Sequence, residues 1–412
     1  KKLLPCFDDP IVRSTFSVKL RIPQNLTGLS NMPIQSVLEM GNEKEITFMK
    51  TPPICCYLLC ICVGLFDFIS GKTKNNLPVK FYAKEGNSQY FGELLNVAIF
   101  AIEWMESKMG VNFELPHLQL ISHSCISCGM ENYGLITLPN YKEHTESKSC
   151  QLVVAHEIVH QWFGDLVSIK WWDSIWLNEG FAQYFEYIVL NNTLGKSTNY
   201  GIDLFIKLDG IKCLDFFGFD KIACKENEFD YSKKALRHIH YIKGAFVLKM
   251  FSDLIGEENF FKICSIYLNS FKNKSVEISD FLNVVNNTMK NDYSKFFDPW
   301  LNEVGLPLLN VVEMYDYNDK IIGIIVTQTS VSAKIYQFNL PILYEKDGKL
   351  EKKTIFIDKE QTEIELEYDW VLVNDEFSSL CAVIFSKVLL EKLVDNRDKI
   401  SEINKKMIFE SP

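Results

Sequence analysis

The chain has 412 residues, of which 47% are hydrophobic and 23% are charged, and its formal net charge is -10 at pH 7. This length predicts about two to four domains with ample core, and the composition is that of a globular chain rather than a disordered one. The acidic balance argues against nucleic acid and anionic membranes as partners.

Residues 1–69 alternate between polar and apolar side chains, for example at 16–22, which predicts β-strands separated by turns. The longest apolar run, residues 54–66, ends before Asp67. It is too short to cross a bilayer, so we expect one buried strand and no membrane segment in this chain. The first ten residues lack the long apolar core of a signal peptide.

Twelve cysteines are scattered along the chain. Small disulfide-linked modules are shorter and denser in cysteine, so we expect buried free thiols and a reducing compartment. A cytoplasmic location is the expectation, although a membrane-anchored or secreted form of a longer protein stays open. Cys125 and Cys128 form an isolated C-x-x-C, for which a structural zinc site is the less favoured interpretation.

From residue 70 the pattern becomes mixed. We expect strands at 77–83 and 117–122, an amphipathic helix at 88–109 and a helical stretch from about 174 to 303. Residues 305–388 return to short alternating runs that predict a small antiparallel β-sandwich. A charged amphipathic helix is expected near the end of the chain.

The sequence HEIVH at 156–160 carries the chemistry. His156 and His160 stand at i and i+4, so on a helix both imidazoles leave one face and can share a tetrahedral metal ion. Glu157 lies one step around that face, where it can act as general base toward a metal-held water. By itself the motif also fits a surface helix with two solvated histidines.

A catalytic zinc site needs a third protein ligand, and the candidate is Glu179 in WLNEGFA. Glu186, seven residues later, is on the same helix face as Glu179. It is a candidate hydrogen-bond partner for a zinc histidine, or else an exposed carboxylate.

These segments resemble the zinc aminopeptidases of the aminopeptidase N and puromycin-sensitive aminopeptidase type, the gluzincins. The family pattern is H-E-x-x-H, 18 residues, then Glu-Gly, which matches 156–160 and 179–180. The family's G-x-M-E-N strand resembles residues 128–132, with Cys128 in place of the first glycine. The family also has a Tyr shortly before Lys-Gly on a later helix, which resembles Tyr241 in the segment 241–244.

The resemblance implies hydrolysis of the N-terminal residue from peptides with a free N-terminus, using one Zn²⁺ per chain held by His156, His160 and Glu179. Glu157 would be the general base, and Tyr241 would stabilise the oxyanion. Glu131 would bind the substrate α-amino group. The implied substrate-binding set is Cys128, Gly129, Met130, Glu131 and Asn132. His238 and His240 are expected to be structural or to line the cleft.

The implied fold class is multidomain α+β. It comprises the C-terminal part of an N-terminal β-domain at 1–69, a thermolysin-like catalytic domain at 70–304, a β-sandwich domain at 305–388 and the start of a helical domain at 389–412. The segment at 5–10 resembles the family's P-C-F-D-E-P, late in its N-terminal domain. We therefore expect the isolated chain to bind zinc but to hydrolyse aminoacyl substrates poorly.

Two other functions remain open at this point. One is a leukotriene-type epoxide hydrolase, which shares the zinc site, although Tyr133 to Thr137 resembles the aminopeptidase W-G-L-I-T. The other is a catalytically impaired homologue that binds peptides. The preferred N-terminal residue, the biological substrates and the oligomeric state do not follow from the sequence.

Overall fold

The computed structural model describes residues 4–194, 222 and 239–410. The described residues form two compact units. The first draws on Lys1–Thr198 and Phe261–Val284, and the second on Asn199–Phe260 and Val285–Pro412. Both contain strands and helices, so the architecture is multidomain α+β. The boundaries expected at 69, 304 and 388 stay predictions.

A β-region opens the first unit. Strands β2, β5 and β4 form one antiparallel sheet in that order, while β3 pairs with β7 and β1 pairs with β6. Ile22, Ile46 and Phe48 form a small core, as the alternating pattern predicts. The strands are β1 Arg13–Ser14, β2 Lys19–Pro23, β3 Thr27–Ser30, β4 Ile34–Met40, β5 Glu43–Phe48, β6 Ile54–Cys55 and β7 Ile61–Gly64.

The prediction of one buried strand at 54–66 is wrong. The run contains β6, a 3₁₀ turn η1 (Cys56–Leu58) and β7, and Val63 is exposed. The side chain of Asn31 explains the break, because its Nδ2 donates to Leu58 O at 2.8 Å and its Oδ1 accepts from Cys60 N at 2.9 Å. These bonds satisfy the backbone at the corner, which lets the chain change partner from β1 to β3.

A four-stranded sheet in the order β11-β10-β9-β8 is the centre of the first unit. Strands β9, β10 and β11 are parallel, and β8 is antiparallel to β9. Helix α1 packs on β8 and β9 and ends at Gly110, whose φ of 63° suits a glycine. The strands predicted at 77–83 and 117–122 and the helix at 88–109 are confirmed. The bounds are β8 Phe66–Lys72, β9 Pro78–Lys84, η2 Ser88–Phe91, α1 Gly92–Met109, β10 Leu118–His123 and β11 Leu135–Pro139.

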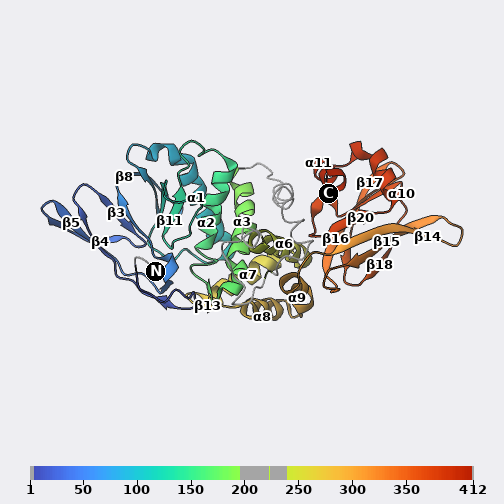
Figure 1. Cartoon of the computed structure of the whole chain (residues 1–412), viewed down its shortest axis with the longest axis horizontal. Helices are drawn as coiled ribbons and strands as arrows, with labels where there is room; N and C mark the ends of the chain where they lie inside the picture. Colours follow the sequence, from blue (N-terminus) through green and yellow to red (C-terminus); the bar gives the residue numbers. More distant parts are fainter. Residues whose placement is uncertain (1–3, 195–221, 223–238, 411–412) are drawn as a thin grey trace. The chain divides into compact units, whose positions relative to one another are not determined.

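Helix α2 (Lys148–His160) packs between α1 and α3 (Trp176–Leu194), as Figure 1 shows. The return from α2 to α3 passes through Gly164, whose φ of 137° is rarely adopted by other residues. Phe163 then stacks on Phe181 with ring centroids 4.3 Å apart. This packing brings the start of α3 beside the end of α2. The neighbouring elements are β12 Ser168–Ile169, η3 Trp172–Ser174, α7 Glu257–Phe271, β13 Ser275–Val276 and α8 Ile278–Met289.

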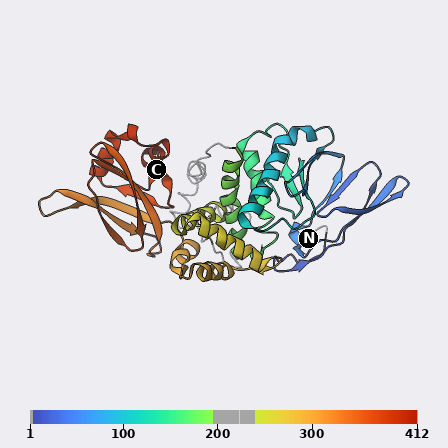
Figure 2. The ribbon, with the colours of Figure 1, turned by 180° about the vertical axis from the view of Figure 1, so that it is seen from behind.

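The second unit contains helices and two sheets, coloured from yellow to red in Figure 2. The sheets have the orders β18-β15-β14-β20 and β17-β16-β19. The short strands expected within 305–388 are present, but β20 runs parallel to β14 and not antiparallel. The chain leaves β19 through the turn η5, and the backbone of β20 then follows β14 in the same direction.

The bounds in the second unit are η4 Ile239–Lys243, α6 Gly244–Ile255, α9 Ser294–Asn302, β14 Leu308–Tyr315, β15 Ile321–Thr329, β16 Phe338–Lys346, β17 Lys349–Ile357, β18 Gln361–Glu365, β19 Trp370–Val373, η5 Asp375–Phe377, β20 Ala382–Phe385, α10 Lys387–Asp395, η6 Arg397–Lys399, α11 Glu402–Lys405 and η7 Lys406–Glu410. The division between the units falls within α7 and α8. A helical stretch is expected from 174 to 303. Its described residues form the helices α3, η4, α6, α7, α8 and α9, and the short strand β13 interrupts them. The rest of the stretch lies outside the described residues. None of the helices among the described residues is long and apolar enough to cross a bilayer.

Candidate active site

Three donor atoms meet between α2 and α3. His156 Nε2 lies 3.0 Å from His160 Nε2, and Glu179 Oε2 lies 3.4 Å and 3.2 Å from these two atoms. All three residues are buried. A tetrahedral zinc ion with bonds of about 2.0–2.1 Å separates its ligand atoms by about 3.3–3.4 Å. The donor set therefore fits zinc in both chemistry and spacing.

The outer nitrogens of both imidazoles have acceptors. His156 Nδ1 lies 2.7 Å from Glu186 Oε2, and His160 Nδ1 lies 2.9 Å from Phe163 O. A carbonyl oxygen can only accept, so the neutral, metal-binding form of His160 carries its proton on Nδ1 and leaves the Nε2 lone pair for the cluster. Such partners fix the orientation of metal-binding histidines.

Glu157 lies beside the three donor atoms with its carboxyl group buried. Burial raises the pKa of Glu157 to about 8, against the lowering effect of His156 and His160. Its Oε2 has no hydrogen-bond partner among the described residues. A buried carboxyl with a pKa near neutrality and a free oxygen is suited to accept and return a proton.

The charges of the donor residues depend on one another. Burial alone would lower the pKa of His160, but the nearby carboxylate of Glu179 outweighs it and raises the pKa to about 9. Burial also opposes ionisation of Glu179, yet the charges and hydrogen bonds of the histidines hold its pKa well below the usual range. A metal ion bound by the same atoms would take the place of the histidine protons.

The strand-like segment at 128–132 passes the same centre. Met130 exchanges two backbone hydrogen bonds with Thr137, of 2.9 and 3.0 Å. Glu131 belongs with Glu157 and His160 to a group whose ligand atoms lie within 4.8 Å of one another, and burial raises its pKa. The Glu131 carboxyl therefore faces the space beside the three donor atoms.

Gly129 makes the closest approach to the proposed base. A Cβ at this position would lie 2.1 Å from Glu157 Oε1. Only glycine lets the backbone pass at this distance. Cys128 precedes it and is exposed. Asn132 is buried, with its Nδ2 donating to Tyr57 O at 3.4 Å.

The predicted oxyanion residue, Tyr241, is half-buried in η4 of the second unit. Its role toward the cluster in the first unit stays a prediction. His240 is buried in the same turn, and His238 lies outside the described residues.

Sequence reasoning missed two glutamines that support the site. Gln161 Nε2 donates to Glu131 O at 3.0 Å, and its Oε1 accepts from Gly134 N at 3.0 Å. Gln183 Nε2 donates to Glu186 Oε1. Their positions in the sequence could have indicated these roles. Gln161 follows His160 directly, and Gln183 lies three residues before Glu186 on the same helix face.

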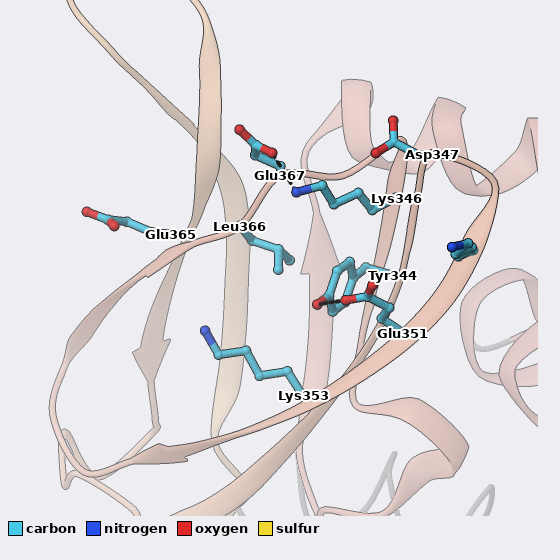
Figure 3. Close-up of a pocket in the computed structure, with 9 residues that line it drawn as sticks. Tyr344, Lys346, Asp347, Glu351, Lys353, Glu365, Leu366 and Glu367 are labelled. Carbon is cyan, nitrogen blue, oxygen red and sulfur yellow. Dashed lines mark hydrogen bonds and ion pairs between the residues drawn. The ribbon is translucent and has the colours of Figure 1, made fainter.

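A pocket of about 450 Å³ lies among β16, β17 and the end of β18 in the second unit (Figure 3). Two pairs of its polar groups contact each other: Lys346 binds Glu367 at 2.7 Å, and Tyr344 donates to Glu351 at 2.6 Å. No metal-binding group among the described residues falls in this pocket. The histidine and glutamate cluster is therefore the better candidate for hydrolysis.

Comparison with known proteins agrees with this choice. Residues 93–300 match the peptidase family M1 domain, and residues 1–58 match the peptidase M1 N-terminal domain. Glutamyl aminopeptidase of Rattus norvegicus is 29% identical over 84% of this chain and 38% of its own length. Aminopeptidase M1-A of Oryza sativa subsp. japonica is 30% identical over 76% of the chain and 36% of its own length.

Probable aminopeptidase 1 of Sulfurisphaera tokodaii is 29% identical over 88% of the chain and 47% of its own length. The chain thus spans between about a third and a half of the length of these relatives. The M1 domain match covers half of the chain and includes the histidine and glutamate cluster. The chain therefore belongs to peptidase family M1.

Proposed function

We propose that the chain carries the catalytic centre of a zinc-dependent aminopeptidase, which hydrolyses the N-terminal residue from peptides with a zinc-activated water. The observation that carries the proposal is the triangle of His156, His160 and Glu179 donor atoms, with edges of 3.0, 3.4 and 3.2 Å. One zinc ion per chain would be held there, in a thermolysin-like catalytic domain.

Zinc held by these residues would supply Lewis acidity, which polarises a carbonyl and lowers the pKa of a water toward neutrality. Glu157 takes the proton of the attacking water and later delivers it to the leaving amine. The pKa of about 8, and an Oε2 that has no hydrogen-bond partner in the described part of the chain, support both halves of this role. Glu186 and Phe163 O hold the two imidazoles in the orientation that binding requires.

Recognition of a free N-terminus is assigned to Glu131. Its carboxyl belongs to the same group of ligand atoms as Glu157 and His160. A substrate ammonium would pair with this carboxyl, and an internal peptide bond has no such group. The backbone of Cys128, Gly129 and Met130, together with Asn132, would guide the substrate past Glu157.

Tyr241 is assigned the oxyanion role. One hydrogen-bond donor of this kind is typically worth roughly 3–4 kcal/mol in the transition state. The assignment depends on the family resemblance of the Tyr-x-Lys-Gly segment.

The substrates are peptides with free N-termini, and a cytoplasmic location is part of the proposal. The ten cysteines that the structure describes carry no disulfide, which suits a reducing compartment. The epoxide hydrolase and the impaired homologue are not favoured, because the relatives are named as aminopeptidases.

The test combines metal content with turnover of an aminoacyl-coumarin and its N-acetylated form. We expect one zinc per chain, loss of turnover with a chelator, recovery with zinc, and no cleavage of the acetylated substrate. His160→Ala should lose the metal, whereas Glu157→Gln should keep it and lose turnover. Equal cleavage of free and acetylated substrates would refute the aminopeptidase assignment.

A further inference from the structure

A second group of metal-binding side chains lies in the N-terminal β-region. The Sγ atoms of Cys6 and Cys56 and a carboxylate oxygen of Asp8 all lie within 4.8 Å of one another. Cys56 Sγ donates to Asp8 Oδ1 at 3.2 Å and approaches Phe7 O at 3.2 Å. This group shares no residue with the histidine and glutamate cluster.

The pairing of two strands brings these residues together. In the antiparallel pair of β1 and β6, Arg13 lies opposite Cys55 and Ser14 lies opposite Ile54. Residues before Arg13 therefore run beside residues after Cys55. Cys55 Sγ adds a bond to Pro10 O at 2.9 Å. The convergence thus follows from the backbone register of the two strands and from the thiol contacts of Cys55 and Cys56.

We propose that Cys6, Asp8 and Cys56 form a second metal site, for a thiophilic divalent cation such as Zn²⁺. Bonds of about 2.3 Å to sulfur and about 2.0–2.2 Å to oxygen place tetrahedral ligand atoms about 3.5–3.8 Å apart. Ligand atoms within 4.8 Å of one another need to move by only about 1 Å to reach this spacing. Cys6 is exposed, so water reaches the fourth position.

The carboxylate distinguishes a metal site from a disulfide pair. A negative charge beside a thiol disfavours the thiolate that attacks in disulfide exchange. The same oxygen is a regular zinc ligand, and a cation at the centre favours both thiolates. Asp8 within 3.2 Å of Cys56 Sγ therefore supports a cation bound between the three groups.

The site would tie the N-terminal segment to the η1 corner. The next residue in that corner is Tyr57, whose carbonyl oxygen accepts from Asn132 Nδ2 in the proposed substrate-binding segment. An ion at Cys56 would thus stabilise a corner in contact with that segment. The second ion is additional to the catalytic zinc, and its ligands are thiolates and a carboxylate.

The test is a cadmium titration of the reduced, metal-free 412-residue chain, followed by the ultraviolet sulfur-to-cadmium charge-transfer band. The catalytic cluster has only nitrogen and oxygen donors and gives no such band. We expect one equivalent of thiolate-bound Cd²⁺ per chain. Cys6→Ser should abolish the band, and this exposed position can be changed without disturbing the core. Asp8→Asn should weaken binding by at least about tenfold.

Cys62→Ser is the matched control, because Cys62 Sγ lies 3.7 Å from Cys60 Sγ in the neighbouring cysteine pair. It should leave the band unchanged. Loss of the band in Cys62→Ser but not in Cys6→Ser would assign the metal to that other pair and overturn the proposal. Absence of the band in the reduced chain would overturn it as well. Neither result bears on peptide hydrolysis, so the aminopeptidase proposal is tested separately.

Discussion

Gly129→Ala is expected to damage catalysis by displacing the proposed base. The new Cβ would lie 2.1 Å from Glu157 Oε1, 2.6 Å from Cδ and 2.9 Å from Cγ, whereas real Cβ atoms essentially never approach closer than 3.0 Å. The two side chains must separate by about 1 Å, and Glu157 is buried on α2. A misplacement of about 1 Å at a reacting group costs roughly 100-fold in rate, or about 2.7 kcal/mol.

The assay is turnover of an aminoacyl-coumarin together with zinc content and thermal stability. We expect kcat to fall about 100-fold while zinc stays bound, because neither imidazole nor Glu179 is touched. Gly92→Ala is the matched control, since a Cβ there has nothing within 4 Å and the residue is helical with φ of -56°. It should leave kcat unchanged and stabilise the chain by up to about 1 kcal/mol.

A double-mutant cycle isolates the cause. In a Glu157→Ala background the clash is gone, so adding Gly129→Ala should cost little further. An undiminished 100-fold loss in that background would mean that the alanine acts by distorting the segment at 128–132. Normal kcat in the single variant would refute the close approach itself.

Three other outcomes are expected. Glu186→Gln should weaken zinc binding by about 10- to 100-fold in a competition titration, with kcat of the zinc-loaded enzyme nearly normal, because the bond to His156 Nδ1 orients a ligand. Tyr241→Phe should retain zinc and lose about 100- to 1,000-fold in kcat, and a near-normal kcat would end the oxyanion assignment. The free energy of unfolding of the chelator-treated chain should fall as pH rises from 6.5 to 9. Burial opposes protonation of His160, but the carboxylate of Glu179 outweighs it and raises the pKa of His160 from 6.5 to about 9 on folding. That contribution is fully present below 6.5 and disappears as pH rises through 9, a change on the order of 1–3 kcal/mol in urea unfolding that His160→Gln should reduce.

The sequence anticipated the features that local geometry determines. Two histidines four residues apart must share a helix face, so α2 could be predicted to present both imidazoles together. The strand at 117–122 and the helix at 88–109 follow equally from periodicity. That Glu179 would be the third donor was expected from its chain position and the family spacing, and the structure brings its carboxylate to the histidines.

The features that sequence reasoning missed depend on contacts distant in the chain. The run at 54–66 is broken because Asn31 hydrogen-bonds the backbone of Leu58 and Cys60. No periodicity within the run indicates a hydrogen bond from a side chain that lies just after another strand. The same holds for Gln161, whose bond to Glu131 O joins residues 30 apart. Helix and strand patterns predict which face a residue occupies, but its partner depends on how distant elements pack.

The composition of the buried cluster favours a cation beside the proposed proton-transfer group. Four carboxyl groups, of Glu131, Glu157, Glu179 and Glu186, surround two imidazoles. The histidines hold Glu179 ionised, while burial raises the pKa of Glu131 and of Glu157. Bringing so many acidic groups out of water is unfavourable unless positive charge is added among them. A divalent ion at the donor triangle would supply that charge, while burial is the main cause that raises the pKa of Glu157 toward neutrality.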